Sequence, residues 1–118
     1  MNWTPLTTHS QLAEIKIESN QHPVLLFKHS TSCSISNTSL NRLERNWNDE
    51  ELKGTKIYYL DLLTYRSISN EIAQLFGIEH ESPQVIIIKN GDAIYNASHF
   101  DIDYNSIKAQ VKKLQIKN

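Results

Sequence analysis

This chain contains several short runs of consecutive apolar residues, and these runs predict its strands. Residues 24–27 (VLLF), 57–60 (IYYL) and 85–88 (VIII) are rich in β-branched, aromatic or aliphatic side chains and are bounded by turn residues. Runs of this kind are typical of strands buried within a sheet. Residues 3–6 and 93–97 predict two further strands, the first a short edge strand. Asn90-Gly91 between the last two runs is a strong hairpin signal, so these two strands should be antiparallel.

Between these runs, apolar residues recur at the three- and four-residue spacing of amphipathic helices. The first helix should extend from a capping box at Thr8 and Gln11 to about Asn20, and the third should start at a Ser67 cap and end before Gly77. The last should begin near Asp101 or Asp103, with Lys112, Lys113 and Lys117 at its C-terminal end. The apolar stripes of the second, third and last helices are Leu40, Leu43 and Trp47; Ile68, Ile72, Leu75 and Phe76; and Tyr104, Ile107, Val111 and Leu114.

The resulting order, βαβαβαββα, predicts the fold. Repeated βαβ crossovers followed by a hairpin and a terminal helix give an α/β protein with a central mixed sheet flanked by helices on both faces. This is the thioredoxin-like arrangement. The length of 118 residues suits a single domain, so we expect one thioredoxin-like domain over residues 1–118.

Charge and hydropathy narrow the choice of partners. Twelve basic and thirteen acidic residues give a formal charge of −1, so no strong positive field favours nucleic acid or an anionic membrane. No apolar stretch reaches the length that a bilayer requires, and the N-terminus does not resemble a secretion signal. We therefore expect a soluble, cytoplasmic protein.

The chemistry that the sequence offers centres on Cys33, its only cysteine. A lone cysteine cannot form an internal disulfide, and the five histidines lack ligand spacing, so we expect no bound metal or other bound cofactor. Cys33 follows a polar loop at the start of a predicted helix, where the helix dipole and free N–H groups, here those of Ile35 and Ser36, stabilise a thiolate. The Ser36 hydroxyl, or positive charge on Lys28 or His29, would add to this effect.

The segment Phe27–Ser36 (FKHSTSCSIS) resembles the thioredoxin-like superfamily, with Ser36 in place of the second cysteine of CxxC. The chain more closely resembles the YtxJ family of monothiol bacilliredoxins. The resemblance lies in Lys28-His29-Ser30, the Cys33-x-x-Ser36 motif, Ser82-Pro83-Gln84 and the Asn90-Gly91 hairpin turn. Thioredoxins carry an acidic residue in the central strand and a tryptophan before the reactive cysteine, where this chain has apolar residues and Ser32.

The resemblance implies thiol–disulfide exchange at Cys33 that removes bacillithiol from S-bacillithiolated proteins. Bacillithiol would be the co-substrate, and a second small thiol, another bacilliredoxin or a reductase would resolve the Cys33 mixed disulfide. The resemblance also implies that Pro83 is cis and faces Cys33, so that Ser82 and Pro83, with the loop residues Thr31 and Ser32, would bind the substrate.

Two other functions remain open from the sequence. One is a monothiol glutaredoxin-like carrier in which Cys33 binds an iron–sulfur cluster with a small thiol as co-ligand. The other is a thioredoxin-fold adaptor without redox activity, in which Cys33 is only a packed side chain.

Overall fold

The strands and helices follow one another in the predicted order in a computed structural model, which describes the backbone of residues 1–116 and the side chains as far as Leu114. One short 3₁₀ helix that the sequence did not predict, η1, adds to this order before the last helix. The elements are β1 (Thr4–Pro5), α1 (Ser10–Glu18), β2 (Val24–His29), α2 (Ser34–Asn46), β3 (Lys56–Asp61), α3 (Arg66–Phe76), β4 (Gln84–Lys89), β5 (Asp92–Ser98), η1 (His99–Asp101) and α4 (Tyr104–Ile116).

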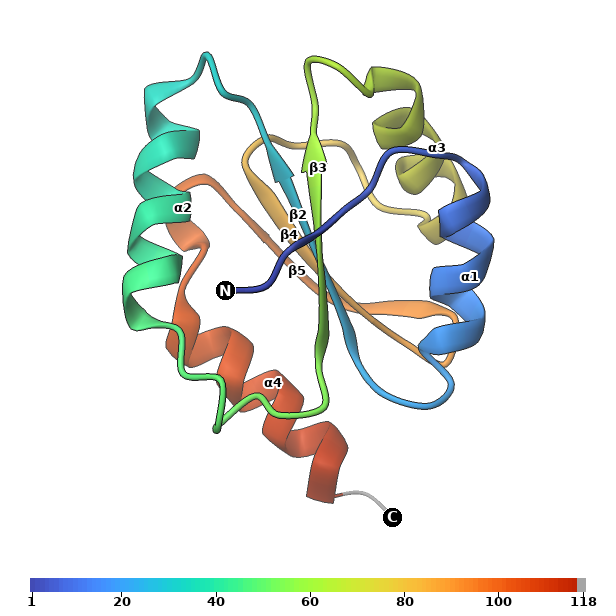
Figure 1. Ribbon diagram of the computed structural model, residues 1–118, viewed down its shortest axis with the longest axis vertical. Helices are drawn as coiled ribbons and strands as arrows, with labels where there is room; N and C mark the ends of the chain where they lie inside the picture. The colour runs from blue at the N-terminus through green and yellow to red at the C-terminus, as the bar shows by residue number, and fades with distance from the viewer. Residues whose placement is uncertain (117–118) are drawn as a thin grey trace.

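The five strands form one mixed sheet in the order β1-β3-β2-β4-β5. β3 runs parallel to both β1 and β2, whereas β4 runs antiparallel to β2 and β5. Helices α2 and α4 cover one face of this sheet, and α1 and α3 cover the other (Figure 1). The thioredoxin-like α/β fold predicted from the hydrophobic pattern is therefore confirmed.

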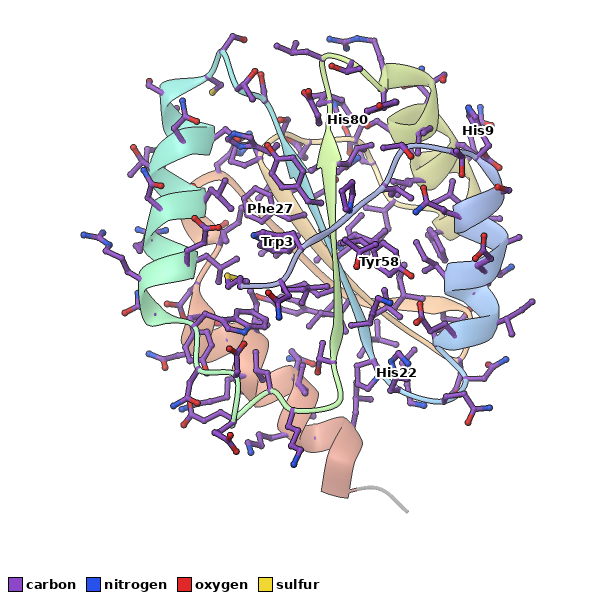
Figure 2. All side chains as sticks on the ribbon, in the orientation of Figure 1. Trp3, His9, His22, Phe27, Tyr58 and His80 are labelled. Atoms are coloured by element: carbon purple, nitrogen blue, oxygen red, sulfur yellow. The ribbon has the colours of Figure 1, made fainter. Side chains whose placement is uncertain are left out.

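Alternation along β2 explains why its residues are apolar without interruption. Leu25 and Phe27 face the α2 and α4 layer, and Val24 and Leu26 face the α1 and α3 layer, so both sides of the strand are buried. Figure 2 shows Trp3 and Phe27 on the α2 side of the sheet, with Tyr58, His9 and His80 on the side of α1 and α3. Burial on both faces makes β2 a rigid support for the loop that follows it.

Local signals set several of the boundaries. Gly77 ends α3 in the left-handed conformation with φ +64°, as expected of a C-terminal cap. Asn90 and Gly91 also have positive φ, 55° and 78°, which matches the turn chemistry of a tight hairpin. Asp103 accepts a hydrogen bond from the N–H of Ser106 at 3.1 Å, so the last helix begins at one of the two predicted caps.

Two local predictions for α3 are wrong. Ser67 does not cap the helix, because the helix already begins at Arg66 and the Ser67 hydroxyl bonds Nε2 of His9, the residue before α1. Leu75 is 37% exposed, since the sheet contacts only the side of the helix that carries Ile68 and Ile72. Of the lysines predicted at the end of α4, Lys117 lies outside the described residues.

The topology brings two functional segments to the same end of the sheet. Because β2 and β4 are antiparallel neighbours, the loop that leaves β2 and the segment that enters β4 lie side by side. The first carries Cys33 and the second carries Ser82 and Pro83. Within residues 1–116, no helix is both long and apolar enough to cross a bilayer.

Candidate active site

Cys33 occupies the N-cap position of α2, as the sequence predicts. Its backbone is extended, with φ −105° and ψ 120°, and its N–H donates to the carbonyl of Ser30 at 3.1 Å. Its carbonyl accepts the first bond of the helix, from the N–H of Asn37 at 3.1 Å. The side chain is half-buried and carries a free thiol. Cys33 is therefore held firmly at its backbone while its side chain remains partly open to solvent.

The residues around Cys33 divide into an exposed rim and a buried support. Thr31 and Ser32 are exposed, as is Ile35, the second residue of the helix, at 38%. Ser36 is completely buried. The N–H groups of the first helical turn lack helical partners in any α-helix, and here this turn begins directly after Cys33. The rim can receive a substrate while the turn supplies hydrogen-bond donors toward an anion.

Ser36 makes its hydrogen bonds toward the end of β2. Its hydroxyl lies 2.6 Å from Nδ1 of His29 and accepts a hydrogen bond from the N–H of Ser30 at 3.1 Å. These contacts fasten the first turn of α2 to the strand. Sequence reasoning named both side chains but missed that they bond each other. A direct bond from Ser36 to the Cys33 sulfur stays a prediction.

His29 is buried, with 3% of its surface exposed. Its ring centroid lies 6.1 Å from that of Phe27 and 5.6 Å from that of Tyr59. Burial lowers the pKa of His29 below its usual 6.5, and the carboxylate of Asp61 only partly opposes this effect. The imidazole is therefore neutral at pH 7. The positive charge that the sequence analysis expected of His29 is not present in this state, so its effect on the thiolate stays a prediction.

Lys28 lies on the other face of the sheet, because successive residues of a strand point in opposite directions. It is fully buried, and its Nζ lies 3.0 Å from Nδ1 of His80. Burial lowers the pKa of Lys28 to about 8. The structure thus brings Lys28 to His80 rather than to the layer that holds α2, and stabilisation of the thiolate by Lys28 stays a prediction without a contact to support it.

The Ser82-Pro83 peptide bond is cis, as the resemblance implies. Lys28 pairs with Gln84, so the register continues with Pro83 level with His29, beside the loop that carries Cys33. The carbonyl of Pro83 accepts a hydrogen bond from the N–H of His99 at 3.0 Å. The Ser82 hydroxyl is buried and has no hydrogen-bond partner among the described residues. Binding of substrate by these two residues stays a prediction.

Metal ligands do not gather at this site. Across the part of the chain that the structure describes, no group of three or more His, Cys, Asp or Glu side chains is arranged to hold a metal ion. A cluster held by Cys33 and an external thiol would not need such a group.

Fold and site together define a thioredoxin-fold protein with a single cysteine at the start of a helix, beside a cis-proline. Structural comparison agrees. A solved protein described as a candidate oxidoreductase with a thioredoxin fold has 30% sequence identity and a TM-score of 0.76, with 92% of this chain and 91% of that chain covered. The sequence model of the family described as monothiol bacilliredoxin BrxC matches residues 4–107. The chain belongs to the monothiol bacilliredoxin family, which confirms the resemblance noted in the sequence.

More distant structures share the fold alone. The thioredoxin of Trypanosoma brucei brucei has 14% identity and a TM-score of 0.73, with 99% of this chain and 93% of that chain covered. The thioredoxin of Malassezia sympodialis also has 14% identity and a TM-score of 0.73, with coverage of 95% and 90%. At this identity the likeness concerns the path of the backbone and not the chemistry at Cys33.

Proposed function

We propose that this protein is a thiol–disulfide oxidoreductase that removes bacillithiol from S-bacillithiolated proteins through Cys33. The observation that carries the proposal is the position of the lone cysteine, half-buried at the N-cap of α2, on the loop that leaves β2 beside the cis Ser82-Pro83 segment. Membership of the monothiol bacilliredoxin family supports the choice of bacillithiol as the small thiol.

In the proposed reaction, the Cys33 thiolate attacks the bacillithiol sulfur of a protein–S–S–bacillithiol bond. The target protein leaves as a thiolate, and Cys33 keeps bacillithiol in a new disulfide. The sequence offers no second cysteine to attack this disulfide. A bacillithiol thiolate, another bacilliredoxin or a reductase then attacks it and restores the Cys33 thiolate. No bound cofactor takes part, because the electrons pass between sulfur atoms.

The surroundings of Cys33 suit this chemistry. Thr31 and Ser32 before the half-buried Cys33 are exposed, and in the proposed complex the backbone of Ser82 pairs with an extended segment of the target protein. We place the activity in the cytoplasm, where small thiols keep free cysteines reduced.

The test uses a purified protein carrying a single S-bacillithiolated cysteine. The wild-type chain should free that cysteine and gain the mass of bacillithiol on Cys33, whereas Cys33→Ser should do neither. Ser39→Ala is a matched control, because Ser39 is buried one helical turn beyond Ser36 and bonds the carbonyl of His99 at 3.2 Å. If the wild-type protein removes no bacillithiol, or if Cys33→Ser removes it at the wild-type rate, the proposed function is wrong.

A further inference from the structure

We propose that Lys28 is a positioning residue for the exchange reaction, which holds residues 79–83 (the docking segment) in place for the target protein through its contact with His80. This inference rests on the proposed function, in which the backbone of Ser82 pairs with the target. Lys28 acts through His80 and does not touch the substrate.

The stability of the fold does not account for a lysine at position 28. Its side chain is fully buried at the end of β2, directly after the apolar residues 24–27. The partner of its ammonium group is the imidazole of His80, with Nζ 3.0 Å from Nδ1, rather than a carboxylate. A buried charge of this kind stabilises a protein less than an apolar side chain of similar size does. The amine therefore points to a role in the geometry of the segment to which His80 belongs.

His80 is in the right state to accept a hydrogen bond from Lys28. Burial lowers the pKa of His80 below its usual 6.5, the positive charges of Lys28 and Arg66 lower it further, and Glu81 only partly opposes them. The imidazole is thus neutral at pH 7, and the lone pair of Nδ1 accepts from the ammonium group. The Ser69 hydroxyl on α3 lies 3.3 Å from the same nitrogen. The docking segment is therefore tied both to β2 and to α3.

Gln84 makes a second buried tie beside the first. It pairs with Lys28 in the antiparallel register of β2 and β4, so the two side chains point to the same face of the sheet. Gln84 is 1% exposed. Its Nε2 donates to the carbonyl of Glu79 at 3.2 Å, and its Oε1 accepts the N–H of Glu81 at 3.3 Å. One pair of neighbouring strand residues thus holds three successive residues of the docking segment.

The docking segment is held from its other side by partly exposed contacts. The carbonyl of Pro83 accepts the N–H of His99 at 3.0 Å, and Nε2 of His99 lies 3.5 Å from Oε2 of Glu81. Ser82 lies between this contact and the buried one. Loss of the contact between Lys28 and His80 should therefore loosen the backbone that meets the target protein, while Cys33 keeps its place at the start of α2.

The first experiment follows a single round of bacillithiol transfer to Cys33 over a range of concentrations of the S-bacillithiolated target protein. Lys28→Met should raise the half-saturating concentration roughly fivefold, because binding must then also order the docking segment. The limiting rate should stay at the wild-type value. Alkylation of Cys33 by iodoacetamide at pH 7 should also keep its wild-type rate, since this small reagent does not need the docking segment.

Either partner of the contact can be removed. His80→Ala should raise the half-saturating concentration as much as Lys28→Met does, and the double variant should raise it no further, because both changes break one contact. A wild-type half-saturating concentration in Lys28→Met would overturn the inference. Slower alkylation in Lys28→Met would overturn it as well, because that result would assign Lys28 to the thiolate and not to the docking segment.

Two matched variants at the opposite end of the sheet control for loss of packing. Lys89→Met removes a strand lysine whose Nζ lies 3.3 Å from the carbonyls of Ser19 and Asn20. His22→Ala removes a histidine far from His80, as Figure 2 shows. Both variants should keep the wild-type half-saturating concentration. A rise equal to that of Lys28→Met in either control would contradict a specific role for the contact.

The second experiment needs no bacillithiol. The amide proton of Glu81, which bonds Gln84, should exchange with solvent faster in Lys28→Met than in the wild-type protein, and Lys89→Met should not change its rate. Equal exchange in Lys28→Met and the wild-type protein would overturn the inference. A wild-type protein that transfers no bacillithiol would instead refute the proposed function, and the exchange rates would then still decide whether Lys28 holds the docking segment.

Discussion

The hydroxyl oxygen of Ser19 accepts a hydrogen bond from the backbone N–H of Gly91, 2.8 Å away and 72 positions later in the chain. The Ser19 carbonyl accepts a second bond from the N–H of Asn90 at 2.9 Å. Ser19 is completely buried. The C-terminal end of α1 is thus hydrogen-bonded to the hairpin turn between β4 and β5. This contact lies at the end of the sheet opposite Cys33.

Replacement of Ser19 by alanine should destabilise the protein by about 1 to 2 kcal/mol, because it leaves the N–H of Gly91 without its partner. Urea unfolding followed by circular dichroism measures this change. Ser10→Ala makes the same substitution at an exposed position of α1 and should alter the free energy of unfolding by less than about 0.5 kcal/mol. Equal losses in the two variants would contradict the prediction.

Replacement of Lys28 by methionine should stabilise the protein at pH 7. The wild-type lysine is fully buried, and its pKa of about 8 means that its charge is held at a cost in the folded state. Removing that charge should add on the order of 2 kcal/mol to the free energy of unfolding at pH 7. The gain should shrink as the pH rises from about 8 toward 10.5, because the wild-type lysine loses its proton in the folded state first.

Thermal unfolding of Lys28→Met and of the wild-type protein, at pH 7 and at pH 10, tests whether the substitution stabilises the protein and whether the gain shrinks at high pH. Lys113→Met, at an exposed position of α4, serves as the control and should show no gain that depends on pH. A Lys28→Met protein that is less stable than wild type at pH 7 would show that the amine makes a net favourable interaction with His80.

The stability of the wild-type protein should fall as the pH drops from 7 to 5. Burial lowers the pKa of His29 in the folded protein, and that of His80 is lowered as well, so the unfolded chain binds more protons near pH 6. Each such group contributes a slope of at most about 1.4 kcal/mol per pH unit. His29→Gln should flatten the profile in urea titrations at several pH values. A slope that does not differ between His29→Gln and wild type would contradict this assignment.

Replacement of Gly77 by alanine should cost about 1 kcal/mol, because φ of +64° brings the added Cβ close to the backbone. Nothing else lies within 4 Å of that Cβ, so the loss reports backbone conformation alone. Gly77→Asn should lose less, since asparagine tolerates this conformation better. Thermal unfolding of the two variants measures the difference, and a larger loss for asparagine would contradict the explanation.

Much of the fold was accessible from local patterns. The apolar runs at 24–27, 57–60 and 85–88 correspond to β2, β3 and β4, and the glycines at 77 and 91 mark real changes in backbone direction. The stripe of Tyr104, Ile107 and Val111 is buried as predicted. These features could be predicted because side-chain period and backbone sterics act over a few neighbouring residues. Leu75 was misplaced because the width of a helix contact depends on the sheet beneath it.

The position of Cys33 at a helix start was also determined by the sequence itself, through the polar loop before it and the apolar stripe after it. Only the tertiary structure decided which hydrogen-bond and charge partners the residues around Cys33 have. Ser36 bonds His29 seven positions earlier, and Asp61 reaches His29 from another strand. Lys28, adjacent to His29 in the chain, faces the opposite side of the sheet and meets His80. The physical reason is that hydrogen bonds and buried charges depend on distance in space, which strand pairing fixes and which sequence spacing leaves open.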